Sequence, residues 1–354
     1  MKDIEIDAAT KEQGIRWIDV RSPGEFETAT IPGAVNVPLF DNEERARIGT
    51  VYKQQGKKEA LRLGMEIVSP KIPRLVESVQ EQSRGRTPLL FCWRGGMRSR
   101  SMAVFLDLVE VPALRLKGGY RAYREYVVQR LSNYTLKPRL IVLHGLTGVG
   151  KTAILHRLRE SGLPVLDLEE LAGHRGSAFG SLGEIRPRNQ RMFDSLLLEV
   201  LEAHQEAPYL FMEAESKRIG RVHMPDFLER AKEVGIPVLV EASMDTRVHH
   251  ILDSYLTDRE DTESFRQNVL GALARIERRF SPDIRTQLYE WARREEYSPM
   301  VRTLLREHYD PRYRHTQDQY EKSFALRICS DDLVRATENL KLFYQHLQPA
   351  QTHS

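Results

Sequence analysis

The sequence is poor in cysteine, with only Cys92 and Cys329 among 354 residues. Two cysteines cannot build the disulfide framework of a small secreted domain or a cysteine-rich zinc site. They fit a reducing compartment, where a single thiol can stay reactive. We therefore expect a cytoplasmic protein without a bound metal centre of this kind, and we expect Cys329 to be buried and to take no part in chemistry.

Long uncharged apolar runs are also missing. No stretch reaches the ~18 residues that a membrane-spanning helix needs. Residues 1–7 (MKDIEID) carry acids where a signal peptide has a basic start and an apolar run. We therefore expect neither a membrane segment nor a secretion signal. Hydrophobic residues make up 41% and charged residues 29%, an ordinary composition for folded domains, and the length allows two of them.

Charge of one sign is not dominant either, because the formal net charge is only +3. Its distribution is uneven: residues 1–137 hold 23 Lys+Arg against 17 Asp+Glu, and residues 266–316 hold 11 arginines but no lysine. Arginine without lysine suits phosphate contacts, yet a solvated helix face with paired charges would look the same. Both interpretations stay open at this point.

The stretch with the clearest chemistry is 92–99, CWRGGMRS, between an apolar run at 88–91 and a helix-like segment at 100–106. Glycines in such a loop allow backbone N–H groups to face an anion. A helix N-terminus and flanking cations favour the thiolate form of a cysteine. Cys92 is therefore the predicted catalytic residue, at the end of a strand. The predicted anion cradle around it consists of Arg94, Gly95, Gly96, Arg98 and Ser99.

Four segments resemble the rhodanese domain, in the family's order: 16–26, 31–38, 92–99 and 114–123. The first two are interpreted as strands, of which the first ends in a Pro-Gly turn. The resemblance implies that these two segments are scaffold, so that Asp19 and Arg21 are structural and only the cysteine loop carries chemistry.

Two features depart from a minimal rhodanese. A charged insertion at about 41–73 follows the second segment, and covering the active site is one role that its length allows. The loop also has the spacing Cys-x5-Arg, one residue longer than in common single-domain sulfurtransferases. A wider loop would admit a tetrahedral oxyanion such as a phosphate. The same spacing occurs in phosphatases built on the rhodanese fold, so a phosphatase remains an alternative.

A second anion site is indicated by GLTGVGKT at 145–152, which lies between an expected strand at 139–144 and a helix at 153–158. This is the phosphate-loop motif in its required context. Its backbone N–H groups and helix dipole hold phosphates, Lys151 adds a mobile positive charge and Thr152 can bind Mg²⁺. The motif predicts a di- or triphosphate site without establishing ATP hydrolysis. The predicted diphosphate-binding residues are Gly145, Gly148, Gly150, Lys151 and Thr152.

The remaining apolar runs suggest a parallel sheet. Expected strands at 164–168, 209–213 and 237–241 alternate with helical segments, which is typical of α/β folds. We therefore predict two α/β domains: a rhodanese-like domain at 1–137, and a phosphate-loop NTPase-like domain with a helical, arginine-rich C-terminal part at 138–354. Glu213 or Glu215 is a candidate for the carboxylate near Mg²⁺, the alternative being an ion pair with a nearby cation.

A glycine-rich basic loop follows the strand at 164–168. It is interpreted as a binding loop for tRNA or another anionic substrate, the alternative being an ordinary surface loop. Its candidate residues are His174, Arg175, Ser177, Arg186, Arg188 and Arg191. From about residue 245 the pattern is helical. Aromatic residues there suit either stacking on unpaired RNA bases or helix packing, with packing favoured; they are Trp291, Tyr297, Tyr309, Tyr313 and Tyr320.

A rhodanese segment followed by a phosphate loop resembles the bacterial tRNA 2-selenouridine synthases, on the motifs at 92–99, 145–152 and 174–177. The resemblance implies that sulfur of wobble 2-thiouridine in tRNA is replaced by selenium from selenophosphate, through a geranylated intermediate made from geranyl diphosphate. It implies that Cys92 is a selenium carrier or nucleophile and that the phosphate loop holds a diphosphate. No tightly bound cofactor is expected, a requirement for Mg²⁺ stays open, and an enzyme that supplies selenophosphate is an expected partner besides tRNA.

Three alternatives belong to other classes. The chain could be a sulfurtransferase fused to a nucleotide-dependent kinase that acts on a small molecule. It could be a phosphatase that uses the Cys-x5-Arg loop. The rhodanese half could also be a binding module without catalysis, in which case a Cys92→Ala variant would stay fully active.

Overall fold

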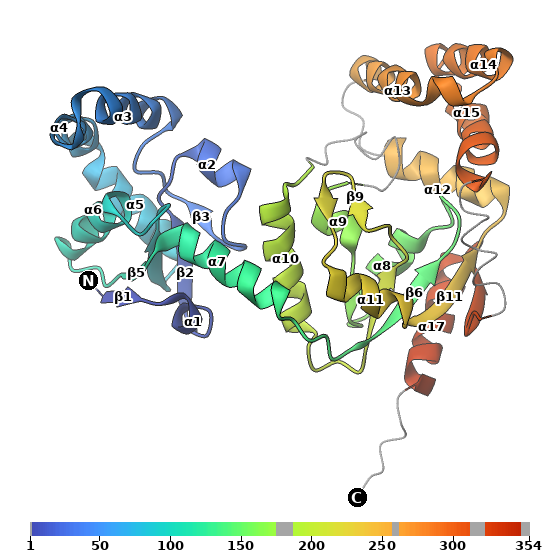
Figure 1. Ribbon diagram of the computed structural model, residues 1–354, viewed down its shortest axis with the longest axis horizontal. Helices are drawn as coiled ribbons and strands as arrows, with labels where there is room; N and C mark the ends of the chain where they lie inside the picture. The colour runs from blue at the N-terminus through green and yellow to red at the C-terminus, as the bar shows by residue number, and fades with distance from the viewer. Residues whose placement is uncertain (1, 175–186, 257–261, 312–322, 348–354) are drawn as a thin grey trace, which may run out of the picture. The chain divides into compact units, whose positions relative to one another are not determined.

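The computed structural model describes residues 2–174, 187–256, 262–311 and 323–347. By its contacts the chain divides into two compact units, one formed by Met1–Asn133 with Arg191–Leu198 and the other by Tyr134–Gln190 with Glu199–Ser354 (Figure 1). Helix α10 (Gln190–Ala203) contributes residues to both. Both units are α/β, as the sequence predicts.

The first unit is built on a parallel sheet with the strand order β1-β5-β4-β2-β3. Its strands are β1 (Lys2–Ile4), β2 (Ile15–Asp19), β3 (Val35–Asn36), β4 (Thr87–Phe91) and β5 (Leu114–Leu116). Its helices are α1 (Ile6–Ala9), α2 (Pro23–Thr28), α3 (Asn42–Gln55), α4 (Lys57–Val68), the 3-10 turn η1 (Ser69–Lys71), α5 (Ile72–Ser83), α6 (Met97–Asp107) and α7 (Gly119–Ser132).

Strand β4 is buried in the middle of this sheet, which explains its continuous apolar run. Leu90 packs with Val79 of α5 and Met102 of α6 in one core cluster. In the register of β2 with β4, Asp19 lies opposite Phe91. The residues that follow both strands therefore meet at one edge of the sheet, where Cys92 begins its loop.

The insertion at 41–73 forms α3, α4, η1 and the start of α5. Asp41 caps α3 by accepting a hydrogen bond from the Glu44 amide at 2.8 Å. Asn42 ties α3 to α2, because its Oδ1 accepts a hydrogen bond from the Gly24 amide at 2.8 Å. The first turn of the insertion thereby lies beside the N-terminus of α2.

The second unit has a parallel sheet with the order β12-β11-β6-β8-β7, and a small antiparallel pair, β9 with β10. Its strands are β6 (Arg139–His144), β7 (Val165–Leu166), β8 (Tyr209–Glu213), β9 (Arg218–Ile219), β10 (Val222–His223), β11 (Ile236–Glu241) and β12 (Leu326–Cys329). Besides α10, its helical elements are α8 (Lys151–Glu160), α9 (Leu168–Ala172), α11 (Asp226–Glu233), α12 (Met244–Leu256), α13 (Thr262–Ile276), η2 (Glu277–Arg279), α14 (Pro282–Arg293), α15 (Tyr297–Leu304), the π-helical η3 (Leu305–Tyr309) and α17 (Leu333–Leu347).

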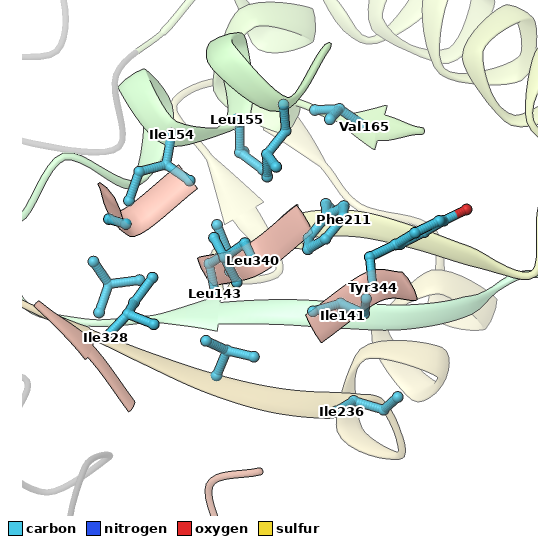
Figure 2. Packing of buried hydrophobic residues seen from close by; sticks show 14 of the residues in the cluster. Ile141, Leu143, Ile154, Leu155, Val165, Phe211, Ile236, Ile328, Leu340 and Tyr344 are labelled. Carbon is cyan, nitrogen blue, oxygen red and sulfur yellow. The ribbon is translucent and has the colours of Figure 1, made fainter. Parts of the chain in front are cut away.

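The core of this sheet is shown in Figure 2. Ile141 of β6 and Phe211 of β8 pack in one cluster with Leu155 of α8 and Leu340 of α17. Phe211 also stacks on Tyr344, with ring centroids 5.7 Å apart. Helix α8, which begins at the end of the phosphate loop, is thus anchored on a fully buried apolar surface.

The C-terminal part differs from the expectation in one element. Helices α12–α15 form their own apolar cluster, as the helical pattern predicts, but Leu326–Cys329 is a strand, β12, parallel to β11. Its alternation places Ile328 inside and Cys329 outside, so Cys329 is exposed and the prediction of a buried cysteine is wrong. None of the helices in the described ranges is long and apolar enough to cross a membrane.

Candidate active site

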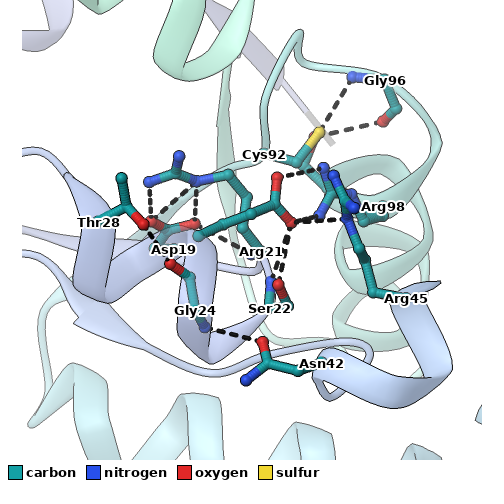
Figure 3. A network of polar contacts seen from close by, with 12 residues as sticks. Asp19, Arg21, Ser22, Gly24, Thr28, Asn42, Arg45, Cys92, Gly96 and Arg98 are labelled. Carbon is teal, nitrogen blue, oxygen red and sulfur yellow. Dashed lines mark hydrogen bonds and ion pairs between the residues drawn. The ribbon is translucent and has the colours of Figure 1, made fainter.

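The Cys92 loop joins the end of β4 to the start of α6 and holds the sulfur among hydrogen-bond donors. Cys92 is 3% exposed. Its Sγ accepts a hydrogen bond from the Gly96 amide at 3.2 Å (Figure 3). The same sulfur lies 3.3 Å from Ser99 Oγ, which is itself buried. Gly95 has a φ of 63°, a conformation that favours glycine. The loop and the N-terminus of α6 thus converge on the one cysteine that the sequence singles out.

The start of α7 packs against the backbone of this loop. Gly119 has a φ of 60°, and a Cβ there would lie 2.2 Å from the Cys92 carbonyl oxygen and 2.4 Å from the Gly95 nitrogen. The amides of Tyr120 and Arg121 donate to the carbonyl oxygens of Cys92 and Trp93, at 2.8 and 2.9 Å. The segment 114–123, which sequence reasoning used only as a family signal, therefore positions the cysteine loop.

The two arginines of the loop have different surroundings. Arg98 is engaged by Glu25 of α2, with Nη1 2.6 Å from Oε2 and Nη2 3.2 Å from Oε1. Arg94 is exposed and forms no ion pair within the part of the chain that the structure describes. Arg94 is thus available to an anion, whereas Arg98 already has a carboxylate partner.

Glu25 was not identified from the sequence. Its carboxylate also accepts hydrogen bonds from Ser22, from the amide at 3.3 Å and from Oγ at 3.2 Å, and lies 3.7 Å from Arg45 Nε of α3. Burial alone would raise the pKa of Glu25, but the hydrogen bonds and charge of Arg98, with the Ser22 amide, outweigh burial and lower it. The only signal in the sequence was its position three residues after Ser22, which predicts a capping box.

Asp19 and Arg21 are structural, in agreement with the sequence interpretation. They are 0% and 2% exposed and form a bidentate pair, with Arg21 Nη2 2.6 Å from Asp19 Oδ2. Thr30 Oγ1 donates to the same carboxylate at 2.9 Å, and the guanidinium lies 4.3 Å from the centre of the Tyr120 ring. The pair fixes the end of β2 beside the loop.

A pocket of about 310 Å³ opens beside these residues in the first unit. Its lining includes Trp93 and Tyr120, whose ring centroids are 5.7 Å apart, together with Glu25 and Arg45. Glu25 therefore lines this pocket and also contacts Arg98 of the Cys92 loop.

The phosphate loop of the second unit has the backbone that its motif requires. Gly145, Gly148 and Gly150 have φ values of 148°, 83° and 84°. A Cβ at Gly145 would lie 2.3 Å from the Val240 carbonyl oxygen, so only glycine fits between β6 and β11. Helix α8 begins at Lys151, which leaves its first amides facing the loop.

Residues outside the motif hold the loop in place. Arg247 of α12 donates from Nε to the Thr147 carbonyl oxygen at 2.9 Å and forms a buried ion pair with Asp310. Ser330 donates to the Val149 carbonyl oxygen at 2.6 Å. Sequence reasoning missed these residues, because they lie about 100 and 180 positions downstream of the loop.

Lys151 and a group of carboxylates complete this site. Lys151 Nζ donates to the carbonyl oxygens of Gly145 and Leu146, at 2.9 and 3.3 Å. Thr152 Oγ1 lies 3.5 Å from a carboxylate oxygen of Glu169 and of Glu213. Glu169, Glu213 and Glu215 each place a carboxylate oxygen within 4.8 Å of the others. Glu169 was not singled out from the sequence, because it follows a short strand rather than a motif.

Glu213 stands out within this group. It is 1% exposed, and its Oε1 is buried without a hydrogen-bond partner among the described residues. Burial raises the pKa of Glu213 well above its ordinary value, and the charges of Glu169 and Asp167 add to this, while Lys151 opposes it. Burial likewise raises the pKa of Glu215 against the influence of Lys151. An unpartnered buried oxygen beside a hydroxyl and further carboxylates suits a hard divalent cation such as Mg²⁺.

Comparison with known proteins assigns both units. The model of the tRNA 2-selenouridine synthase AAA domain matches residues 138–341, and the model of the rhodanese-like domain matches residues 4–126. The chain belongs to the tRNA 2-selenouridine synthase family.

Individual members of the family extend this match. The tRNA 2-selenouridine synthase of Hahella chejuensis is 33% identical over 349 residues, which cover 89% of this chain and 88% of that protein. The one of Nitrosomonas europaea is 36% identical over 244 residues, covering 68% of this chain. The chain spans 63% of the length of that relative. Among solved structures, the N-terminal domain of a putative ATP/GTP binding protein from Clostridium difficile 630 is 39% identical over 36% of this chain and 99% of that chain, with a TM-score of 0.35.

In this family member the predicted basic loop is only partly described, because Arg175, Ser177 and Arg186 lie outside the described residues. His174 packs against Gly220, and burial, with the charge of Arg221, lowers its pKa. Arg188 donates to the carbonyl oxygens of Glu170 and Leu171 at the end of α9.

The structure also locates Arg191 and three of the aromatic residues of the C-terminal helices. Arg191 is exposed on α10 and lines the pocket beside Trp93. In the C-terminal helices, Tyr297 and Tyr309 are buried in the apolar cluster and Trp291 packs against it, which confirms the packing interpretation for these three. Tyr313 and Tyr320 lie outside the described residues.

Proposed function

We propose that this chain is a tRNA 2-selenouridine synthase that replaces the sulfur of wobble 2-thiouridine with selenium from selenophosphate, after geranylation of that sulfur by geranyl diphosphate. The observation that carries the proposal is the presence in one chain of two different anion loops, one with a cysteine and one with Lys151, in a family member matched to the Hahella chejuensis enzyme over 89% of its length. Its substrates are a tRNA, selenophosphate and geranyl diphosphate.

The chemistry of the cysteine loop favours a nucleophilic role for Cys92 over a selenium carrier. Alkylation of the 2-thiocarbonyl sulfur makes that sulfur a better leaving group. The Cys92 thiolate attacks C2 of the alkylated base and geranylthiol leaves after protonation; selenophosphate then displaces Cys92 through its selenium, and water cleaves the Se–P bond to release phosphate. No atom changes oxidation state overall in this sequence, whereas a perselenide formed from selenophosphate would need an oxidant.

The division of labour follows from the two loops. The Cys92 loop binds selenophosphate through Arg94, while its Gly96 amide donates to the Cys92 sulfur. The phosphate loop, with Lys151 and the N-terminal amides of α8, holds the diphosphate of geranyl diphosphate. A diphosphate leaving group needs neutralisation of its charge, which Lys151 and the amides supply.

A divalent cation fits beside this diphosphate. Thr152, Glu169 and Glu213 would hold it, with Glu215 next to them. When bound, Mg²⁺ would neutralise charge on the leaving diphosphate. The carboxylates would hold the cation, and Lys151 would supply a further positive charge from the loop.

The experiment that tests the function is nucleoside mass spectrometry of bulk tRNA from cells lacking this gene, complemented with wild type, Cys92→Ser or Cys329→Ser. Cys329 is the matched control, because it is exposed and far from either loop in sequence. We expect 2-selenouridine with wild type and Cys329→Ser, and none with Cys92→Ser. Selenouridine that never depends on the gene would leave the kinase-linked sulfurtransferase as the better assignment, and phosphate release from aryl phosphates would favour the phosphatase.

A further inference from the structure

We propose that Glu25 lowers the affinity of the Cys92 loop for simple tetrahedral oxyanions, inorganic phosphate first among them, by holding Arg98 in an ion pair. Glu25 is thus a positioning residue that acts through Arg98. The predicted change in phosphate affinity depends on the Cys92 loop alone. The advantage of weak phosphate binding for the enzyme rests on the proposed function.

The geometry of the pair carries this inference. In a Cys-x5-Arg loop the guanidinium fork of the arginine is the group that can take two oxygens of a tetrahedral anion. Here both Nη atoms of Arg98 contact the Glu25 carboxylate, at 2.6 and 3.2 Å. The two side chains are 22% and 18% exposed, so water screens their attraction only in part.

Glu25 also has contacts other than Arg98. Ser22 donates to its carboxylate through its amide and its hydroxyl, and Arg45 lies 3.7 Å away. The lowered pKa keeps the carboxylate charged at neutral pH. An oxyanion that enters the loop must therefore either separate Arg98 from a carboxylate that is held in place, or bind beside a group of like charge.

This arrangement matters for a loop that uses selenophosphate. Phosphate is a product of the proposed reaction, and it differs from selenophosphate by one atom. A loop with a free arginine fork would bind both and would be inhibited by its product. With Arg98 engaged, affinity for the shared oxyanion part is reduced, and Arg94, which is exposed, is left for the substrate.

The test is equilibrium dialysis of the full chain with isotope-labelled inorganic phosphate at constant ionic strength. All chains carry Lys151→Ala, so that binding at the phosphate loop is weakened equally. In this background Glu25→Gln is compared with Glu27→Gln, which removes an exposed charge from the same helix. Glutamine at position 25 keeps the capping box of α2, so folding is preserved.

We expect Glu25→Gln to bind phosphate about tenfold more tightly, since a charge-assisted contact of Arg98 becomes available to the anion. Glu27→Gln should leave the affinity unchanged. In chains that also carry Arg98→Met, the gain from Glu25→Gln should disappear. General damage to the loop would weaken binding, so a gain of affinity separates this role from a merely structural one.

Unchanged or weaker binding in Glu25→Gln would overturn the proposal, and so would a gain that persists without Arg98. The assay contains no tRNA, so its failure leaves the selenouridine measurement untouched. Conversely, loss of the proposed function in cells would leave the phosphate result standing.

Discussion

The two loops of this protein share a local architecture and differ in the partner of their cation. Each follows a buried parallel strand, contains at least one glycine with positive φ, and ends at the N-terminus of a helix. In the first unit Arg98 is paired with the carboxylate of Glu25, while Arg94 is exposed. In the second, Lys151 contacts only carbonyl oxygens of its own loop in the described structure, and the carboxylates gather around Thr152.

The comparison teaches that a loop motif determines where an anion can be held, and that neighbouring elements determine how strongly. Lys151 can leave two neutral carbonyl oxygens for a diphosphate at little cost. Arg98 must leave a charged partner that is itself held by Ser22. We therefore propose that the second loop binds a polyanion tightly and that the first holds a weakly bound substrate beside Cys92.

The largest expected effect comes from removing the cation of the second loop. Lys151→Ala should abolish geranylation of 2-thiouridine tRNA with geranyl diphosphate, because the leaving diphosphate loses its mobile charge. Selenation of tRNA that is already geranylated should continue. Both steps are measured by nucleoside mass spectrometry on purified protein, with Lys341→Ala of α17 as the control. Equal loss of both steps would contradict the division of labour between the loops.

The next effect concerns the support of the first loop. Gly119→Ala would force a Cβ to 2.2 Å from the Cys92 carbonyl oxygen, whereas Gly33→Ala, at a φ of 73°, meets nothing within 4 Å. We expect Gly33→Ala to lower the free energy of unfolding by about 1 kcal/mol, the cost of its backbone conformation alone. Gly119→Ala should lower the free energy of unfolding by roughly 3 kcal/mol or more, since the backbone around Cys92 must also move.

Urea unfolding of both glycine variants provides the measurement. If the two substitutions cost the same, close packing of α7 against the cysteine loop would not matter for stability. Selenouridine formation should survive in Gly33→Ala and be lost in Gly119→Ala.

The free energy of unfolding should also depend on pH through His144, at the end of the strand before the second loop. This change should be no larger than that caused by Gly119→Ala. Burial, with the charges of Lys151 and Lys232, lowers the pKa of His144 from 6.5 to about 4. Below pH 6.5 the unfolded chain takes up a proton that the folded chain does not, so the free energy of unfolding falls as the pH drops from 6.5 toward 4. The loss approaches roughly 3 kcal/mol.

His144→Gln should remove this part of the acid destabilisation. Urea unfolding at pH 7, 5.5 and 4 would show it as a shallower dependence on pH than in wild type. His249→Gln, on an exposed part of α12, is the control and should keep the wild-type slope. An unchanged slope in His144→Gln would mean that other groups account for the acid sensitivity.

The smallest effect is expected from Glu213, the buried carboxyl group beside Thr152. Because the folded-state pKa of Glu213 is raised, the unfolded chain ionises first as the pH increases, and the free energy of unfolding falls above pH 4.5. Glu213→Gln should therefore stabilise the metal-free protein by about 1 kcal/mol at pH 8 and hardly at pH 4. Glu160→Gln, on the exposed side of α8, is the control. Equal unfolding free energies of Glu213→Gln and wild type at pH 8 would contradict a buried, uncompensated carboxyl group.

Much of the fold was predictable because its signals are local. The apolar runs at 88–91, 139–144, 209–213 and 237–241 are all strands or parts of strands. Strand β12 was missed because its four residues follow a long helical region and pair only with β11, which is distant in sequence. The alternation of its side chains between the two faces of the sheet exposes Cys329, against the expectation.

The sequence by itself determined the two glycine-containing loops, with Cys92 in one and Lys151 in the other, since each motif is contiguous and its backbone geometry follows from its own residues. Only the tertiary structure decided which charges face these groups. Glu25 reaches Arg98 across 73 positions, and Glu213 reaches Thr152 across 61. Such contacts depend on the register of parallel strands, which brings distant chain segments to one edge of a sheet, and no local pattern of residues specifies that register.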